Sequence, residues 1–193
     1  MGKNRLEAFS DGVLAIIITI MVLELKTPAS PDLAALLRLG HVSFAYVMSF
    51  LYVGIYWNNH HHLFHTVTRV TAGTLWANLL LLFWLSLFPF ATAWAGQNPA
   101  APLPTAVYGA VLLLAALFYY ILQRTIIASH GPHSILATAI GHDWKGKISP
   151  VIYIAAIPLA FLNPHISQAL YLGVAILWTI PDRRIERALK AGS

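Results

Sequence analysis

The chain alternates long apolar stretches with short polar connections. Six apolar stretches are bounded by charged residues or by turn-forming Pro, Gly, Asn and Ser, and they cover residues 9–25, 39–59, 72–94, 105–128, 148–162 and 166–180. A helix needs ~20 largely apolar residues to cross the hydrocarbon core of a bilayer. The pattern therefore predicts an all-α membrane protein with six transmembrane helices. The last two stretches are short, so they either tilt into a close hairpin or do not fully cross.

The composition excludes an ordinary soluble fold. Of 193 residues, 58% are hydrophobic and 10% are charged, whereas soluble domains carry roughly 25% charged residues. Six spans use most of the length, so residues 1–193 are expected to form a single transmembrane domain. The chain has no cysteine, which excludes disulfides and thiolate chemistry. Glu7 and Asp11 interrupt the basic N-terminus, so the first stretch is expected to stay as a helix rather than to be cleaved as a signal peptide.

The net charge of +5 indicates topology rather than a nucleic-acid partner. With six spans, the N-terminus, the second and fourth connections and the C-terminal tail lie on one side of the membrane. They carry ten of the twelve Lys and Arg residues, and only Lys26 and Arg38 fall on the other side. Positive residues stay cytoplasmic. We therefore expect a multi-pass protein of the cell membrane with both termini in the cytoplasm.

The start of the first stretch carries the most unusual polar residues. Ser10 and Asp11 stand where the apolar run begins, and ionisable residues inside a membrane span indicate function unless they are paired. An N-cap is an equally good interpretation, since Ser and Asp oxygens accept free backbone N–H groups at helix starts. With the N-terminus inside, the Asn- and His-rich end of the second stretch reaches the same depth and offers hydrogen-bonding partners.

The rest of the first helix is apolar on one face. At ~100° per residue, Ile16, Ile20 and Leu23 fall within ~60° of one another and Thr19 lies at the edge of this stripe. Ser10 and Asp11 point away from the stripe by ~120° or more. Periodicity alone leaves two interpretations open: the stripe packs against lipid or neighbouring helices, or it lines a pore.

These residues resemble a known signature. Arg5 followed by Phe9-Ser10-Asp11-Gly12 and an Ile/Leu-rich helix is similar to the start of transmembrane protein 175, the lysosomal potassium channel, and of its prokaryotic relatives. The resemblance extends to six spans, inside termini and a Trp/Asn/His-rich end of the second helix. Beyond the motif, the chain matches in architecture only.

The resemblance implies a homotetramer with the first helices around a central pore. It places Ile16 at the constriction and Thr19, Ile20 and Leu23 along the axis. It also implies a structural network that holds the first helix against the second and third, for which we take Arg5, Phe9, Ser10, Asp11, Gly12, Asn58, His61 and His62. The implied function is a leak-like potassium channel with modest preference over sodium and an apolar gate. Its partners are lipid and monovalent cations, with potassium as permeant ion and no cofactor.

Two other functions remain open on the residues alone. A proton-coupled transporter is one, using Asp11 and the cluster His60–His65. A histidine-metal membrane enzyme is another, because His61 and His65 have the i, i+4 spacing of a helical metal pair. Such enzymes need several His-rich boxes or paired carboxylates, and the chain has only seven acidic residues. We therefore expect no enzymatic activity.

Overall fold

A computed structural model describes residues 2–132, 134, 136–137 and 143–180. Within these residues the chain is helical and has no β-strand. The helices are α1 (Lys3–Leu23), α2 (Leu33–Arg38), α3 (Gly40–His65), α4 (Ala72–Ser86), α5 (Phe88–Gln97), α6 (Pro102–His130), α8 (Trp144–Leu159) and α9 (Pro164–Thr179). The predicted all-α fold class is confirmed.

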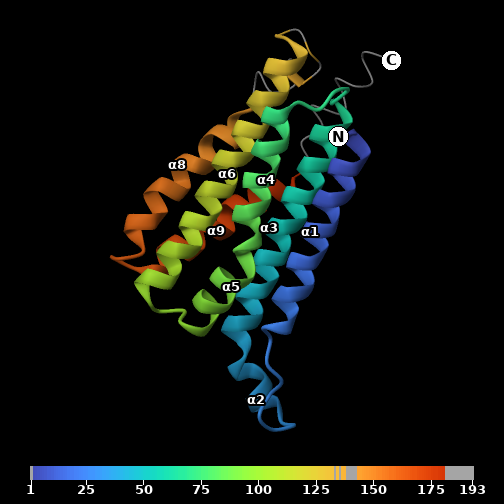
Figure 1. Ribbon diagram of the computed structural model, residues 1–193. Coiled ribbons are helices and arrows are strands. Elements are labelled where there is room, and N and C mark those ends of the chain that lie inside the picture. The colour runs from blue at the N-terminus through green and yellow to red at the C-terminus, as the bar shows by residue number, and fades with distance from the viewer. Residues whose placement is uncertain (1, 133, 135, 138–142, 181–193) are drawn as a thin grey trace.

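The helices form an elongated bundle in which the chain runs back and forth between two ends (Figure 1). The start of α1 and the end of α3 lie at one end, and α2 lies at the other. α1 is at an edge, where it packs against α3, α4 and α5. α6 is central and packs against α4, α5, α8 and α9. One broad side of α1 is therefore left without a partner inside the subunit.

The predicted stretches coincide with helices, with three differences. α1 begins at Lys3, two turns before the apolar run. The stretch 72–94 is broken at Leu87 into α4 and α5, and Pro89 lies in the first turn of α5. Proline has no backbone N–H and clashes with the preceding turn of a continuous helix, which explains a break at this point. The short helix α2 lies within a segment expected to be a loop.

Asp32 starts α2. Its Oδ1 accepts a hydrogen bond from the backbone N–H of Ala35 at 2.6 Å, and its Oδ2 accepts one from the Ser30 hydroxyl at 2.6 Å. Both bonds favour the ionised carboxylate. The Ser30 bond first, and the Ala35 bond second, hold the pKa of Asp32 below its ordinary value.

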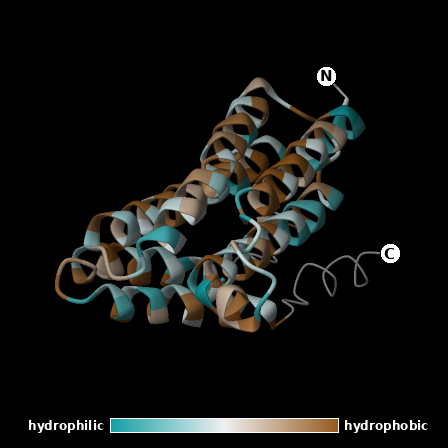
Figure 2. Ribbon diagram, turned by 90° about the horizontal axis from the view of Figure 1, so that it is seen from below, coloured by the Kyte–Doolittle hydropathy of each residue, from teal (hydrophilic) through white to brown (hydrophobic). Residues whose placement is uncertain are grey.

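Length and apolarity support a membrane protein. Among the described residues, three helical segments are long and apolar enough to cross a bilayer: Lys3–Leu23, Ala72–Gln97 and Pro102–His130. α8 and α9 have 16 residues each and are ~24 Å long at 1.5 Å per residue, short of the ~30 Å hydrocarbon core. Apolar residues are spread along the ribbon throughout the bundle (Figure 2). Many large ones are exposed on the surface of the subunit.

Polar groups in the interior are hydrogen-bonded to one another. The Ser49 hydroxyl lies 2.9 Å from the Tyr108 hydroxyl and accepts a bond from Thr92 at 2.6 Å. Tyr52 donates to the backbone oxygen of Tyr171 at 2.6 Å. These bonds join α3, α5, α6 and α9. Without water, such groups must find partners inside the protein, and interhelical bonds of this kind hold membrane bundles together.

Candidate pore helix and its polar brace

α1 has two different faces. Leu6, Ser10, Leu14, Ile17 and Met21 are buried against the neighbouring helices. On the other side, Ile16 is 58% exposed, Ile20 43% and Leu23 80%. The apolar stripe deduced from the sequence is thus the face that the subunit leaves uncovered.

Thr19 belongs to the uncovered face. It is exposed, and its hydroxyl donates to the backbone oxygen of Ile16 at 2.9 Å. A hydroxyl has one proton to donate and two lone pairs that accept. Because the proton is used within the helix, the oxygen keeps its lone pairs for an external donor or a cation.

The buried face of α1 is fixed by a three-helix hydrogen-bond bridge. Asn78 on α4 donates through Nδ2 to the Ser10 hydroxyl at 3.0 Å. Its Oδ1 accepts from Nε2 of His60 on α3 at 2.7 Å. Ser10 in turn donates to the backbone oxygen of Leu6 at 2.9 Å. All three side chains are at most 2% exposed. We call Ser10, Asn78 and His60 the polar bridge.

Asp11 is held by a different residue, on the surface of the bundle. Nε1 of Trp57 on α3 donates to Asp11 Oδ1 at 3.1 Å. The Trp57 ring stacks on His61, with centroids 6.3 Å apart and planes inclined by 22°. The N-cap of α1 is Gly2 and makes no side-chain cap bond. The capping interpretation of Ser10 and Asp11 is therefore wrong, because both residues lie inside the helix, about two turns from its start.

The other residues assigned to the network lie around these bonds rather than in them. Arg5, Gly12 and Asn58 are exposed, and Phe9 is 49% exposed. The ring of His62 is 5.8 Å from that of His61. The structure thus brings Ser10, Asp11 and His61 close to the helix contacts, and leaves Arg5, Phe9, Gly12 and Asn58 at the surface of the single subunit.

Sequence reasoning missed three residues that make these contacts. The sequence pattern placed Trp57 and His60 in the Trp/Asn/His-rich end of the second helix without assigning either a partner, and it did not single out Asn78. A signal for Asn78 was present, because it is a lone amide in an otherwise apolar run. A polar side chain in a membrane helix must be hydrogen-bonded, usually to another helix.

Lys145 belongs to the predicted cytoplasmic set of cations and has a structural role. Lys145 is buried, and its ammonium donates to the backbone oxygens of Leu177 and Ile180 at 3.2 and 3.0 Å. A cation at the C-terminal end of a helix neutralises free carbonyl groups and the negative end of the dipole. Lys145 therefore joins the start of α8 to the end of α9. The basic tail 183–190 lies outside the described residues.

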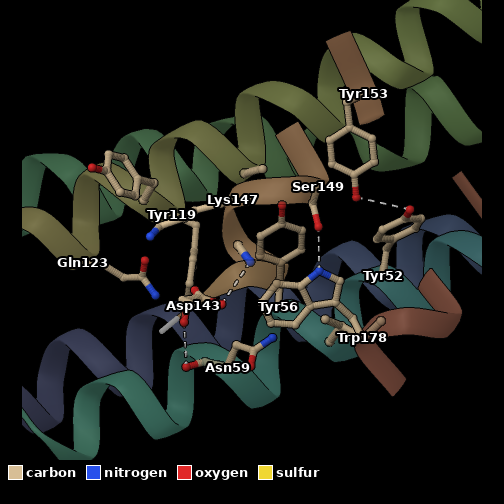
Figure 3. A pocket seen from close by; sticks show the side chains of 14 residues that line it. Tyr52, Tyr56, Asn59, Tyr119, Gln123, Asp143, Lys147, Ser149, Tyr153 and Trp178 are labelled. Carbon is tan, nitrogen blue, oxygen red and sulfur yellow. Dashed lines mark hydrogen bonds between the residues drawn. The ribbon is translucent and has the colours of Figure 1, made fainter. Parts of the chain in front are cut away.

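A pocket between α3, α6, α8 and α9 is lined by aromatic side chains together with polar and small ones (Figure 3). It has a volume of about 80 Å³, and its walls are joined by hydrogen bonds from Trp178 to Ser149 at 2.9 Å and from Tyr153 to Tyr52 at 3.3 Å. No residue of α1 lines it. The pocket is thus separate from the uncovered stripe. No group of three or more His, Asp or Glu suited to a metal ion occurs within the described residues.

Comparison with known proteins shows the family of the chain. The family model of the endosomal/lysosomal potassium channel TMEM175 matches residues 5–89. A potassium channel of Chryseobacterium sp. (strain P1-3) is 53% identical over 190 residues, covering 98% of this chain and 99% of the relative. The chain belongs to the TMEM175 family. The predicted family is confirmed, and the matched region contains Ser10, Asp11, Trp57, His60 and Asn78.

Other TMEM175 relatives support the fold. The crystal structure of a lysosomal potassium-selective channel TMEM175 homolog from Chamaesiphon minutus superposes with a TM-score of 0.82, at 29% identity, over 93% of this chain and 97% of the other. The endosomal/lysosomal proton channel TMEM175 of Bos taurus is 31% identical over 147 residues, covering 68% of this chain but 31% of the bovine protein. These relatives are ion channels, which supports the expectation that the chain is not an enzyme.

Proposed function

We propose that this TMEM175-family protein is a potassium channel whose pore is lined by α1 from several copies of the chain. The observation that carries the proposal is the uncovered stripe of Ile16, Ile20 and Leu23 on the face of α1 opposite Ser10. The potassium channels among its relatives, and the 0.82 TM-score with a potassium-selective homolog, support the same function.

The assembly is a closed homotetramer. A single subunit offers one pore helix, which cannot enclose a path for ions. Closed cyclic symmetry brings the same helix face from each copy to a common axis. We take the number of subunits, four, from the resemblance to the TMEM175 family. The polar bridge fixes the angle at which α1 presents its stripe, since it anchors the opposite face of the helix to α3 and α4.

The subunit crosses the cell membrane six times, with both termini in the cytoplasm. α1, α3, the α4–α5 pair, α6, α8 and α9 supply the crossings. Lys3 and Arg5 belong to the first turn of α1, and Arg69 belongs to the connection between α3 and α4. Arg38 belongs to α2 and Lys26 to the connection that precedes it. The start of α1 and the end of α3 lie at one end of the bundle, and α2 lies at the other (Figure 1). This charge bias supports the orientation.

Selection and gating reside in the stripe. A ring of Ile16 side chains forms an apolar constriction that closes by dewetting. An ion that passes sheds part of its water there, and potassium does so more readily than sodium, which gives a modest preference. The Thr19 hydroxyls offer lone pairs to the partly dehydrated ion. No cofactor is needed, and potassium is the permeant species.

Reconstituted liposomes test the proposal. A potassium gradient should drive flux through the wild-type protein, with a smaller flux for a sodium gradient. Ile16→Asn should raise the flux and reduce the potassium preference. The asparagine side chains of the assembled subunits would keep water at the constriction, so a passing ion would lose less of its hydration. The matched control is Ile154→Asn on α8, since Ile154 is 59% exposed and Ile16 58%, and α8 lies across the bundle from α1 (Figure 1). Equal flux and equal preference in wild type and Ile16→Asn would overturn the proposal.

A proton-coupled carrier predicts a different dependence of ion flux on substrate concentration and on the proton gradient. Carrier flux saturates and depends on the proton gradient, whereas a pore gives unitary current steps in planar bilayers. In the structure Asp11 is bonded to Trp57 and His60 to Asn78, so both candidate proton carriers are engaged in helix contacts. Unitary steps that persist without a proton gradient would exclude the carrier.

A further inference from the structure

A histidine pair at the end of α3 has no part in the proposed pore. Nε2 of His61 lies 3.0 Å from Nε2 of His65, one helical turn later. The rings meet edge to face, with centroids 4.5 Å apart and planes inclined by 85°. Both side chains are exposed. Two imidazole nitrogens therefore face each other at a site that is open to solvent.

The separation of the two nitrogens suits a metal ion. Metal–imidazole bonds are ~2.0–2.1 Å long. An ion at that distance from both Nε2 atoms, which are 3.0 Å apart, would see them at an angle of roughly 90–100°. This is the angle between neighbouring ligands in the square or tetragonal sites of Cu²⁺ and Ni²⁺, and is smaller than the tetrahedral angle of zinc sites.

We propose that His61 and His65 bind a divalent transition-metal ion of the Cu²⁺ or Ni²⁺ class at this end of the subunit. The ion replaces the hydrogen bond between the two rings and lies to one side of the line that joins the two Nε2 atoms. Each Nε2 then supplies a lone pair, and the ring that carried the Nε2 proton holds it on Nδ1 instead. Because both rings are exposed, water fills the remaining coordination positions.

The site adjoins the contact between α1 and α3. His61 stacks on Trp57, whose indole N–H is bonded to Asp11 on α1. A bound ion would thus lie beside one particular tryptophan. Because Cu²⁺ quenches the fluorescence of a nearby indole, this placement gives a readout that reports position as well as binding.

His62 offers a matched control. It is the neighbour of His61 in sequence, with ring centroids 5.8 Å apart, but one residue is ~100° of rotation around the helix. Its ring therefore projects in a different direction from the i, i+4 pair. A metal held nonspecifically by a histidine-rich surface would respond to His62 as much as to its neighbours.

The experiment titrates tag-free, full-length protein in detergent with Cu²⁺ and with Ni²⁺, by calorimetry and by tryptophan fluorescence. Loss of a residue that only supports a metal ligand costs about 10- to 100-fold in affinity, and loss of a ligand at least as much. We expect His61→Ala and His65→Ala each to weaken binding by at least about tenfold. His62→Ala should bind like wild type. Trp57→Phe should bind the metal but lose most of the Cu²⁺ quenching.

Two results would overturn the proposal. One is unchanged affinity in both His61→Ala and His65→Ala. The other is an equal loss of affinity in His62→Ala, which would indicate diffuse binding along the cluster. All three side chains lie at the end of α3 outside the packed core, so circular dichroism should show the same helix content in every variant.

Discussion

The Asn78 side chain on α4 donates to the Ser10 hydroxyl on α1 at 3.0 Å, in the buried centre of the polar bridge. The same amide accepts from His60 on α3. One side chain therefore ties the proposed pore helix to two neighbours. In a membrane, where association gains little from the hydrophobic effect, such bonds fix the position and rotation of a helix.

Asn78→Leu should destabilise the subunit. The substitution keeps the size of the side chain but leaves His60 Nε2 without its acceptor in an apolar interior. An unsatisfied buried group costs about 1–3 kcal/mol. Thermal unfolding in detergent should show a lower Tm than wild type. Asn98→Leu is the control, because Asn98 is exposed at the end of α5. Equal Tm values for the two variants would contradict the bridge.

The bond from Trp57 to Asp11 predicts coupling between these residues. A double-mutant cycle of Trp57→Phe and Asp11→Ala should give a coupling energy of about 0.5–1.5 kcal/mol, since each change removes one partner of the same hydrogen bond. The matched cycle uses Asn58→Ala, which alters the residue next to Trp57 and should couple to Asp11→Ala by less than about 0.5 kcal/mol. Stronger coupling to Asn58 would refute the assignment of Trp57.

Gly109 on α6 is expected to tolerate no larger residue. A Cβ there would collide with the hydroxyl end of Tyr171 on α9, which is buried and donates to the backbone oxygen of Thr105. Gly109→Ala should lower the stability by about 1–3 kcal/mol through overpacking. Gly173→Ala on α9 meets nothing within 4 Å and should be neutral or stabilising by up to about 1 kcal/mol. Unfolding in detergent compares the two, and a destabilised Gly173→Ala with an intact Gly109→Ala would contradict the packing.

The cap at Asp32 predicts local pH dependence. Its folded pKa lies below the ordinary value because Ser30 and then Ala35 donate to the carboxylate, so the cap stabilises α2 above the unfolded pKa of about 4. The contribution disappears as the pH falls through the lower, folded value. The protection of α2 amides, measured as the intrinsic exchange rate divided by the observed one, should therefore fall at the acid end of this window. In Asp32→Asn this loss of protection should be absent. An identical pH profile in both proteins would rule out the cap as its cause.

The apolar pattern predicted which residues form the long helices. A helix that lies in lipid needs a long apolar run, and this requirement does not depend on how the helices pack against one another. The pattern did not predict the break at Leu87 or the short helix α2. The break follows from Pro89 within an otherwise continuous run, a signal that was visible but unused. α2 has six residues, too few for a periodic pattern to indicate it, and Asp32 caps its start.

The candidate site was predictable in part. Helical geometry separated Ser10 from the stripe at Ile16, and the structure buries the first and exposes the second. The partners of Ser10 and Asp11 were not predictable, since the sequence does not state which polar residue of another helix reaches them. Asn78 lies within α4, and Trp57 lies one turn before His61 on α3. Both side chains reach α1 only because the three helices pack together.

The absence of cysteine allows the most direct test of the central claim, that α1 lines the pore. Ile16→Cys and Ile154→Cys each introduce a single thiol at nearly equal exposure in one subunit, 58% and 59%. Potassium flux through liposomes is measured for both variants before and after addition of Cd²⁺, which binds converging thiolates. The pore predicts that Cd²⁺ blocks Ile16→Cys and leaves Ile154→Cys unaffected. Potassium flux through Ile16→Cys that does not respond to Cd²⁺, or an equal block of both variants, would contradict it.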